Sequence, residues 1–523
     1  MDQFYEYTCN IYDINPKLEY FRRVRCREVV IWKLIVPIPY NSLFLHPAYL
    51  KVIKVYGPTS AENLRHLIST AINLEQLIMT RRANYPWILN MKDTPALANL
   101  KQLKLLRLTT CQHLVVTSGV IDSEELGLPM MDCYFPKLEQ FEILKRYPSA
   151  QYLTFVKTIL KFVARHSGSL KNLTLNLIPL TSVRSIDGTL MRLYQGENAA
   201  QGDGNVSEDD VRSAAERERQ GSSLSPKDIN LEGLCKLDLR YLSITTEGKE
   251  EDIFVWKEIL ETQKQLQELR FDWLRREPVS EVLARANGFP WIHFRQPILQ
   301  CSASLVHVDL SSLSMCCGNF YYFDRKISFA DITSNVLPFD LSLFRDCDKL
   351  KGLQLRCRES HCQFHGLIVG ESNSPREENA EAPVSPEPEW HETLLAVNAK
   401  DLPASIESLE IVSLPMLSTD IHDMMKKLVN LRKCFLKDCG KTKNLGVSAD
   451  VVREIGNLAH LSFLDIVSFN DCTEEKRKDL ETVFQAIGRP FRGADTWLEF
   501  DDGRTSAHQS LKNLRPSPCT PIE

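Results

Sequence analysis

The sequence predicts an α/β solenoid in which short parallel strands alternate with helices and irregular segments. Three observations lead to this fold class. An apolar hexamer, L-x-x-L-x-L with conservative replacements, recurs along the 523 residues. Helical patterns fall between several copies, and another apolar residue or Cys often follows three residues after the hexamer. A single unit of this kind cannot bury its own apolar face, so successive units must stack to form a core.

The hexamer predicts the strands. Its twelve copies begin at Leu50, Leu74, Leu103, Leu138, Leu170, Leu234, Leu266, Leu305, Leu350, Ile406, Leu431 and Leu461. Because strand residues alternate between the two faces of a sheet, the fourth and sixth hexamer residues should point into a common core. The additional apolar position is filled in eight copies, by Cys111, Ile178, Leu242, Leu274, Leu313, Leu414, Cys439 and Phe469.

Apolar residues at three- and four-residue spacing predict helices between several strands. The predicted helices cover residues 62–71, 155–165, 254–263, 421–428, 451–458 and 474–487. Strand, turn, helix and turn then repeat at roughly 24–35 residues per unit, which is a typical solenoid period. We expect a curved parallel sheet on the concave side, with helices and irregular segments outside it.

Two stretches of the sequence resemble a known repeat family. LKLLRLTTCQHL (103–114) and LRKCFLKDCG (431–440) are similar to the cysteine-containing subtype of the leucine-rich repeat, in which a Cys occupies the turn after the strand. Cys111 and Cys439 match that position. Leucine-rich helices alone can also produce L-x-x-L, but they would not retain the additional apolar position. The resemblance covers roughly residues 45–500 and implies a leucine-rich-repeat solenoid.

The same repeat subtype is common in F-box/leucine-rich-repeat substrate receptors. In those proteins the repeats recognise a protein substrate, and the F-box binds a Skp1-like adaptor. The F-box itself is not found in this sequence, because no Leu-Pro-x-Glu start precedes Leu50. The resemblance therefore leaves open whether an F-box is missing, divergent or truncated.

Composition predicts the domain boundaries. Residues 1–45 should form an N-terminal cap or remnant segment, residues 46–500 a solenoid of about twelve units, and residues 501–523 a disordered tail. The stretches 195–228 and 371–389 contain few large apolar residues and many polar, charged or Pro residues. They cannot bury enough surface to offset the entropy of ordering, so we predict disordered inserts. These segments contain Ser-Pro and Thr-Pro pairs, and the sequence does not decide whether they are phosphorylated.

Charge and cysteine content narrow the function classes. The chain has 63 Lys and Arg against 68 Asp and Glu, a balance that gives no support for nucleic-acid or membrane-surface binding. No apolar run reaches the roughly 18–20 residues of a membrane helix, and the N-terminus does not resemble a signal peptide. Fifteen cysteines without a framework suggest reduced thiols. We expect a cytoplasmic or nuclear protein.

Motifs that would carry catalysis are missing from the sequence, including both glycine-rich phosphate loops, H-E-x-x-H and G-x-S-x-G. The one metal-like cluster comprises Cys357, His361, Cys362 and His365. Structural zinc usually takes two ligands from a distant second knuckle, so we interpret this cluster as exposed loop residues. His307 is interpreted as a surface residue of a strand. We therefore predict no enzyme, no cofactor and no metal.

The predicted binding site is the concave face of the sheet. Residues between the inward-pointing ones face outward, and neighbouring strands align them into a wall. The predicted protein-binding residues are Arg107, Glu142, Asp238, Arg270, Asp309, Gln354, Glu410, Phe435, Phe463 and Asp465. Arginine and aromatic residues are the usual anchors of protein interfaces, and the aspartates would select for charge. A mixed-charge strand face can also serve only to keep the protein in solution. The pattern therefore does not assign a binding role to any individual residue.

These observations predict a non-catalytic protein–protein interaction scaffold. The family resemblance implies substrate recognition for an F-box-type ubiquitin ligase. The alternative is a leucine-rich-repeat regulator or inhibitor of another enzyme such as a GTPase. A run of aromatic residues along successive columns would favour that alternative, and the sequence offers only Phe435 with Phe463.

Overall fold

The computed structural model of the protein consists of two compact units. Unit 1 comprises Met1–Leu266 and Phe271–Arg276, and unit 2 comprises Gln267–Arg270 and Glu277–Glu523. The residues that the structure describes are 7–11, 26–32, 49–56, 61–81, 97–110, 131–147, 149–179, 231–246, 250–273, 291–312, 341–357, 401–412, 416–437, 439, 446–467, 473–489, 492–494 and 497–501. The predicted inserts at 195–228 and 371–389 lie outside them, as does the tail beyond residue 501.

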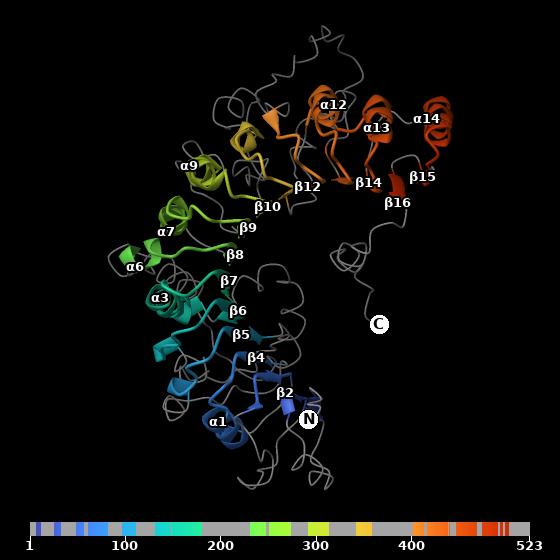
Figure 1. The fold of residues 1–523 in the computed structure, drawn as a ribbon. Coiled ribbons are helices and arrows are strands. Elements are labelled where there is room, and N and C mark those ends of the chain that lie inside the picture. The colour runs from blue at the N-terminus through green and yellow to red at the C-terminus, as the bar shows by residue number, and fades with distance from the viewer. Residues whose placement is uncertain are drawn as a thin grey trace, which may run out of the picture. The chain divides into compact units, whose positions relative to one another are not determined.

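Unit 1 contains a parallel sheet whose strands follow one another in chain order. Its strands are β1 (Tyr7–Ile11), β2 (Cys26–Ile31), β3 (Val52–Val55), β4 (Gln76–Arg81), β5 (Leu105–Thr110), β6 (Gln140–Tyr147), β7 (Asn172–Pro179) and β8 (Tyr241–Thr246). Its helices α1 (Ala61–Thr70), α3 (Ser149–Arg165), α6 (Leu231–Cys235) and α7 (Glu250–Glu261) lie on one side of these strands (Figure 1). Residues of β9 (Glu268–Trp273) belong to both units.

Unit 2 also has a parallel sheet in chain order, formed by β10 (His307–Ser312), β11 (Gly352–Cys357), β12 (Ser408–Val412), β13 (Lys433–Lys437) and β14 (Phe463–Val467). Beyond β14 the direction reverses, because β16 (Trp497–Asp501) is antiparallel to β14 and β15 (Arg492–Ala494) is antiparallel to β16. The helices are α9 (Trp291–Cys301), the 3₁₀ helix η8 (Leu341–Phe344), α12 (Ser418–Lys427), α13 (Ala449–Gly456) and α14 (Glu474–Ala486).

The predicted fold class is confirmed, since both units are α/β and their parallel strands follow the chain, as in a solenoid. The six predicted helices correspond to α1, α3, α7, α12, α13 and α14. The helix starts of α13 and α14 carry side-chain caps: Ser448 Oγ accepts from the Val451 N–H at 3.4 Å, and Thr473 Oγ1 accepts from the Lys476 N–H at 3.3 Å. Among the described helices, none combines the length and apolar character needed to cross a membrane.

The hexamers build the core as the alternation of strand side chains requires. In all twelve copies the first, fourth and sixth residues are at most 9% exposed. Neighbouring copies pair in register, so that Leu409 lies opposite Leu353 on one side and Cys434 on the other. Each unit therefore buries a continuous layer of aliphatic side chains between its strands and its helices.

The frame of the sixth hexamer was predicted wrongly. Leu234 lies in α6, and the strand that follows is β8, in which Leu242 pairs with Leu173. The correct hexamer is therefore 239–244 and not 234–239. Both frames place buried leucines at the same spacing, because an apolar helix turn imitates L-x-x-L.

The segment predicted as an N-terminal cap contributes two strands, β1 and β2, to the sheet of unit 1. The sequence of β2, CREVVI, follows the hexamer with Cys26 at the first position and with Val29 and Ile31 completely buried. A search that accepts Cys at the first hexamer position would have found it.

Candidate functional site

The candidate site lies on the face of the sheet that the helices leave uncovered. In each unit the helices lie on one side of the strands (Figure 1), and the hexamer residues at positions three, five and seven point to the other side. We call this side the open face. Buried and partly exposed residues alternate strictly along β8 and β13, so the outward-pointing side chains there remain accessible.

The predicted central column of the wall is a true register row in each unit. In unit 1, successive strand pairs align Lys54, Ile78, Arg107, Glu142, Thr174 and Ser243. In unit 2 they align Asp309, Gln354, Glu410, Phe435 and Asp465. Arg270 lies on β9 and is exposed.

Asp238 is not part of this row, which corrects the prediction. It lies in the turn between α6 and β8, where its exposed carboxylate pairs with Lys171 at 2.8 Å. Ser243 occupies the position that was expected for Asp238. The wrong frame of the sixth hexamer is the reason for this error.

Arg107 and Glu142 form a bidentate pair across β5 and β6. Arg107 Nε donates to Glu142 Oε2 at 2.6 Å, and Nη2 donates to Oε1 at 2.8 Å. Gln140 donates a further hydrogen bond to the same carboxylate. The pKa of Arg107 is raised, chiefly by the hydrogen bonds to Glu142 and against the opposing effect of burial. Arg107 therefore presents an oriented, partly neutralised guanidinium on the open face of unit 1.

A second arginine–carboxylate cluster lies on the open face of unit 2. Arg356 donates to Glu410 from Nε at 2.5 Å and from Nη2 at 3.0 Å, and Nη2 also donates to Gln354 at 2.8 Å. Its Nη1 is 3.8 Å from an Asp309 carboxylate oxygen. Three of the predicted residues thus share one arginine that sequence reasoning missed. Because Arg356 follows Gln354 by two residues on one strand, the rule of alternate faces could have identified it.

Phe435 is the aromatic residue of the predicted set that remains partly exposed. Lys433 and Lys437 flank it on β13, and all three side chains point to the open face because they alternate along the strand. Within the part of the chain that the structure describes, the ammonium groups of these two lysines form no hydrogen bond or ion pair.

Phe463 and Asp465 do not offer exposed contacts. Phe463 is 7% exposed and Asp465 is 3% exposed, although both occupy outward positions of β14. β14 is not an edge strand, because β16 pairs with it in antiparallel register. Glu142 and Glu410 are 8% exposed and likewise buried, so these four residues are removed from the set of exposed contact residues. Phe435 loses the aromatic partner that the sequence suggested.

Alternating charges fill the second hexamer position and neutralise one another. Glu75 accepts ion pairs from Lys51 and, at 3.2 Å, from Lys104. The pKa of Glu75 is lowered, and the hydrogen bond from Lys51 is the largest cause. In unit 2, Glu407 is paired in the same way with Lys351 at 3.0 Å and Arg432 at 3.5 Å. Within each unit these pairs link consecutive repeats and leave little charge for a ligand.

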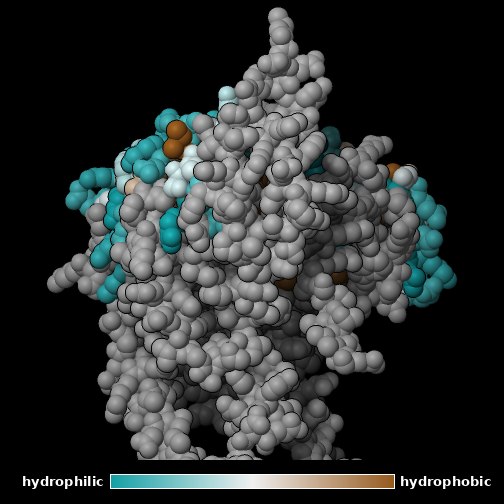
Figure 2. All heavy atoms as spheres, turned by 90° about the horizontal axis from the view of Figure 1, so that it is seen from below, coloured by the Kyte–Doolittle hydropathy of each residue, from teal (hydrophilic) through white to brown (hydrophobic). Residues whose placement is uncertain are grey.

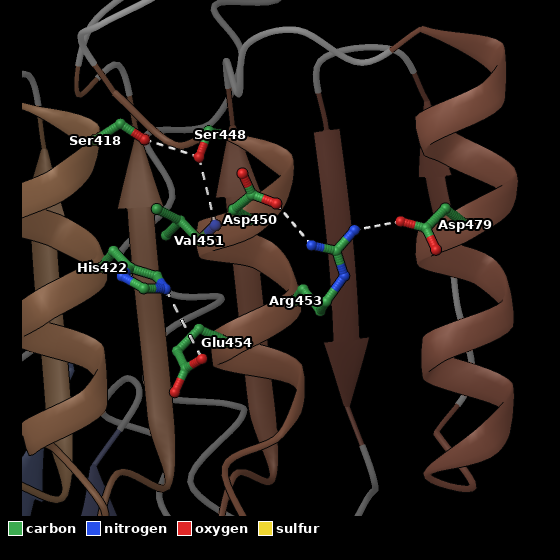
Figure 3. A network of polar contacts seen from close by, with 8 residues as sticks. All are labelled: Ser418, His422, Ser448, Asp450, Val451, Arg453, Glu454 and Asp479. Atoms are coloured by element: carbon green, nitrogen blue, oxygen red, sulfur yellow. Dashed lines mark hydrogen bonds and ion pairs between the residues drawn. The ribbon is translucent and has the colours of Figure 1, made fainter.

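The helix side of unit 2 is joined by polar contacts of its own (Figure 3). Arg453 on α13 pairs with Asp450 at 2.6 Å and with Asp479 on α14. His422 on α12 lies 3.9 Å from a carboxylate oxygen of Glu454 on α13. The contacts to Glu454 and Asp479 join neighbouring helices, whereas the lysines of β13 have no ion-pair partner among the described residues.

The described surface has no broad apolar patch. Figure 2 shows hydrophilic side chains over most of the described part of one face, with hydrophobic residues as separate spots. The large apolar residues that are exposed come from different elements: Tyr49, Ile72, Tyr134, Val429 and Ile487. Such isolated residues are normal on a protein surface, and none of the five belongs to the register rows of the open face.

Burial shifts the pKa values of several titratable groups in the described core. His166 is 1% exposed, and burial lowers its pKa to about 4. Burial raises the pKa of the Cys301 and Cys347 thiols to about 12, so neither is a ready nucleophile. Cys439 is buried after β13, and its Sγ donates to the carbonyl of Ile411 at 3.8 Å.

His307 is an exposed residue of β10, as predicted. Its imidazole ring lies over Gly352 of β11, where a Cβ atom would collide with the ring. Of the metal-like cluster, Cys357 ends β11, and residues 358–365 lie outside the described residues. The described residues contain no group of three or more His, Cys, Asp or Glu arranged to hold a metal ion.

Comparison with known proteins adds no relative to this picture. No protein-family model matches the sequence, and no curated protein matches it either. The function must therefore be inferred from the geometry of the open face.

Proposed function

We propose that the chain is a non-catalytic scaffold that binds a protein ligand on the open face of its sheet. The observation that carries this proposal is the division of the strands into an inward and an outward side, which is strict along β8 and β13. Inward residues form an aliphatic core, whereas the outward row of each unit is mostly polar, aligned in register and not covered by the helices. Solenoid proteins use such an uncovered strand face as an extended binding surface.

Two features of the open face favour a protein ligand. The arginines at 107 and 356 are held by carboxylates, so they lose little side-chain entropy when a ligand binds. Phe435 adds a partly exposed aromatic group, and arginine and aromatic residues dominate the energetics of protein interfaces.

We further propose that the repeats are leucine-rich repeats that recognise a substrate for an F-box-type ubiquitin ligase, through a Skp1-like adaptor, in the cytoplasm or nucleus. The support for this narrower role is the resemblance of the hexamers. The buried Cys439 in the turn after β13 is consistent with the cysteine-containing subtype. The alternative role, regulation of an enzyme such as a GTPase, loses its support because Phe463 is buried.

Affinity capture followed by mass spectrometry tests the scaffold. The open-face variant combines Arg107→Ala, Arg270→Ala and Phe435→Ala. The matched control combines Lys161→Ala, Lys426→Ala and Val429→Ala, which removes two cations and one apolar side chain from exposed sites on α3, on α12 and just after α12.

Proteins captured by the wild type and the control, but lost from the open-face variant, would be ligands of the open face. Identical protein sets for all three chains would contradict the proposal. Recovery of a Skp1-like adaptor by the wild type and by the open-face variant would support the ligase role, and its absence from every sample would leave a free-standing scaffold.

A further inference from the structure

We propose that Lys433, Phe435 and Lys437 form a docking site for an extended acidic segment of the protein ligand. The inference rests on the proposed function, because it names the chemistry of a ligand for the open face. The ligand segment would carry one motif, in which an apolar side chain is flanked on each side by a carboxylate two residues away.

The spacing of the three side chains sets the spacing of the motif. Alternate residues of a strand lie about 6.6 Å apart, so the Cα atoms of Lys433 and Lys437 are separated by about 13 Å. Alternate residues of an extended ligand segment have the same spacing. Glutamates four positions apart in such a segment would therefore match the two ammonium groups, and the residue midway would lie over the Phe435 ring.

Side chains must provide this recognition, because the backbone of β13 is already engaged. β13 pairs with β12 on one side and with β14 on the other. Addition of a ligand strand to the sheet edge is therefore excluded at this position.

The charges around the three residues favour an acidic ligand. Glu410, beside Phe435 on β12, is 8% exposed and is held by Arg356. Asp465, beside Phe435 on β14, is 3% exposed. The two carboxylates directly beside Phe435 are therefore buried, while the two lysines are partly exposed and, among the described residues, unpaired. We therefore expect a locally positive surface at the two lysines, although the whole chain carries a formal net charge of −5.

A single phosphate or carboxylate does not fit this arrangement well. The ammonium groups extend from positions about 13 Å apart, and a partly exposed aromatic ring lies between them. The aromatic ring would remain unused with a small anion, whereas an apolar side chain of a peptide would cover it. Burying such an aromatic contact typically contributes more than the exposed ion pairs beside it.

Fluorescence anisotropy with the full chain tests the site. The probe is a labelled nine-residue peptide with glutamates at its third and seventh positions, leucine at the fifth and serine or glycine elsewhere. A second peptide carries lysines in place of the glutamates, and a third carries serine in place of the leucine. We expect the acidic peptide to bind saturably with a Kd below about 100 μM at low salt, and the basic peptide to bind at least about tenfold more weakly.

The variants separate charge from packing. Lys433→Glu with Lys437→Glu should weaken the acidic peptide about tenfold or more, and should reverse the preference toward the basic peptide. The control, Lys349→Glu with Lys426→Glu, makes the same charge change at exposed sites off the open face and should leave the affinity unchanged. Phe435→Ala should weaken the acidic peptide about fivefold or more but leave the serine-containing peptide unaffected.

Absence of saturable binding, or equal binding by the charge-reversed variant and the wild type, would overturn the inference. Circular dichroism spectra and melting temperatures equal to those of the wild type show that each variant is folded. The scaffold proposal is judged separately by affinity capture. If captured proteins are lost from the Arg107, Arg270 and Phe435 variant but retained by the Lys433 and Lys437 variant, the scaffold stands and only the acidic motif fails.

Discussion

Acidification should loosen the segment around Phe135 through His166, the residue that follows α3. Its Nε2 accepts a hydrogen bond from the Phe135 N–H at 2.9 Å, so Nδ1 carries the proton and donates to the Phe162 carbonyl at 2.8 Å. The imidazole is also packed against the rings of Tyr134 and Phe162. Protonation of Nε2 would place two donors face to face in a buried site, so the segment around Phe135 must open before His166 becomes charged.

The size of the effect follows from the pKa. Burial lowers the pKa of His166 from 6.5 to about 4. Because the folded value lies below the unfolded one, the neutral ring contributes full stability above pH 6.5, and this stability is lost as the pH falls from 6.5 to about 4. At about 1.4 kcal/mol per pH unit the total loss is about 3 kcal/mol, of which about 2 kcal/mol is reached at pH 5.

Hydrogen exchange measured by mass spectrometry detects this loss of stability in individual peptides. After correction for the intrinsic exchange rate, peptides covering residues 131–138 should lose protection about thirtyfold between pH 7.5 and pH 5, whereas residues 74–79 should keep theirs. The His166→Gln variant retains an acceptor but does not titrate, so its protection should depend little on pH. Equal protection of the wild-type segment at both pH values would refute this reasoning.

Two further predictions concern the open face and the core beneath it. Arg107→Ala removes the bidentate partner of the mostly buried Glu142, so it should lower the free energy of unfolding by about 1–2 kcal/mol in urea titrations. The double variant Arg107→Ala/Glu142→Ala should recover part of this loss, because no unpaired carboxylate remains. Leu436→Ala should cost about 2–5 kcal/mol because that side chain is completely buried, whereas Phe435→Ala, one residue earlier but pointing outward, should cost under about 1 kcal/mol. Similar melting temperatures for these two variants would contradict the assigned faces of β13.

Much of the fold could be predicted from local patterning alone. A buried parallel strand needs apolar residues at fixed positions, and the twelve hexamers and six helices supply that signal without any long-range information. The frame of one copy was wrong because leucines of α6 imitate the strand spacing, and this shifted the expected contact from Ser243 to Asp238. β2 was missed because Cys26 stands where other copies have Leu.

The candidate site was less predictable, because its properties depend on pairs of residues far apart in the sequence. Outward positions follow from strand alternation, so the row with Arg107 in unit 1 and the row with Phe435 in unit 2 were identified correctly. No local pattern predicts the burial of Phe463 or the pairing of β16 with β14. The bond from Arg356 to Glu410 spans 54 residues and crosses a predicted insert.

The central claim is that a protein ligand occupies the open face and leaves the helix side free. Lysine acetylation, measured by mass spectrometry with and without a captured ligand, tests it most directly. The account predicts that the ligand protects open-face lysines, at Lys54 in unit 1 or at Lys433 and Lys437 in unit 2, while Lys161 and Lys426 on the helices react as before. Protection of the helix lysines with unchanged reactivity on the open face would contradict it.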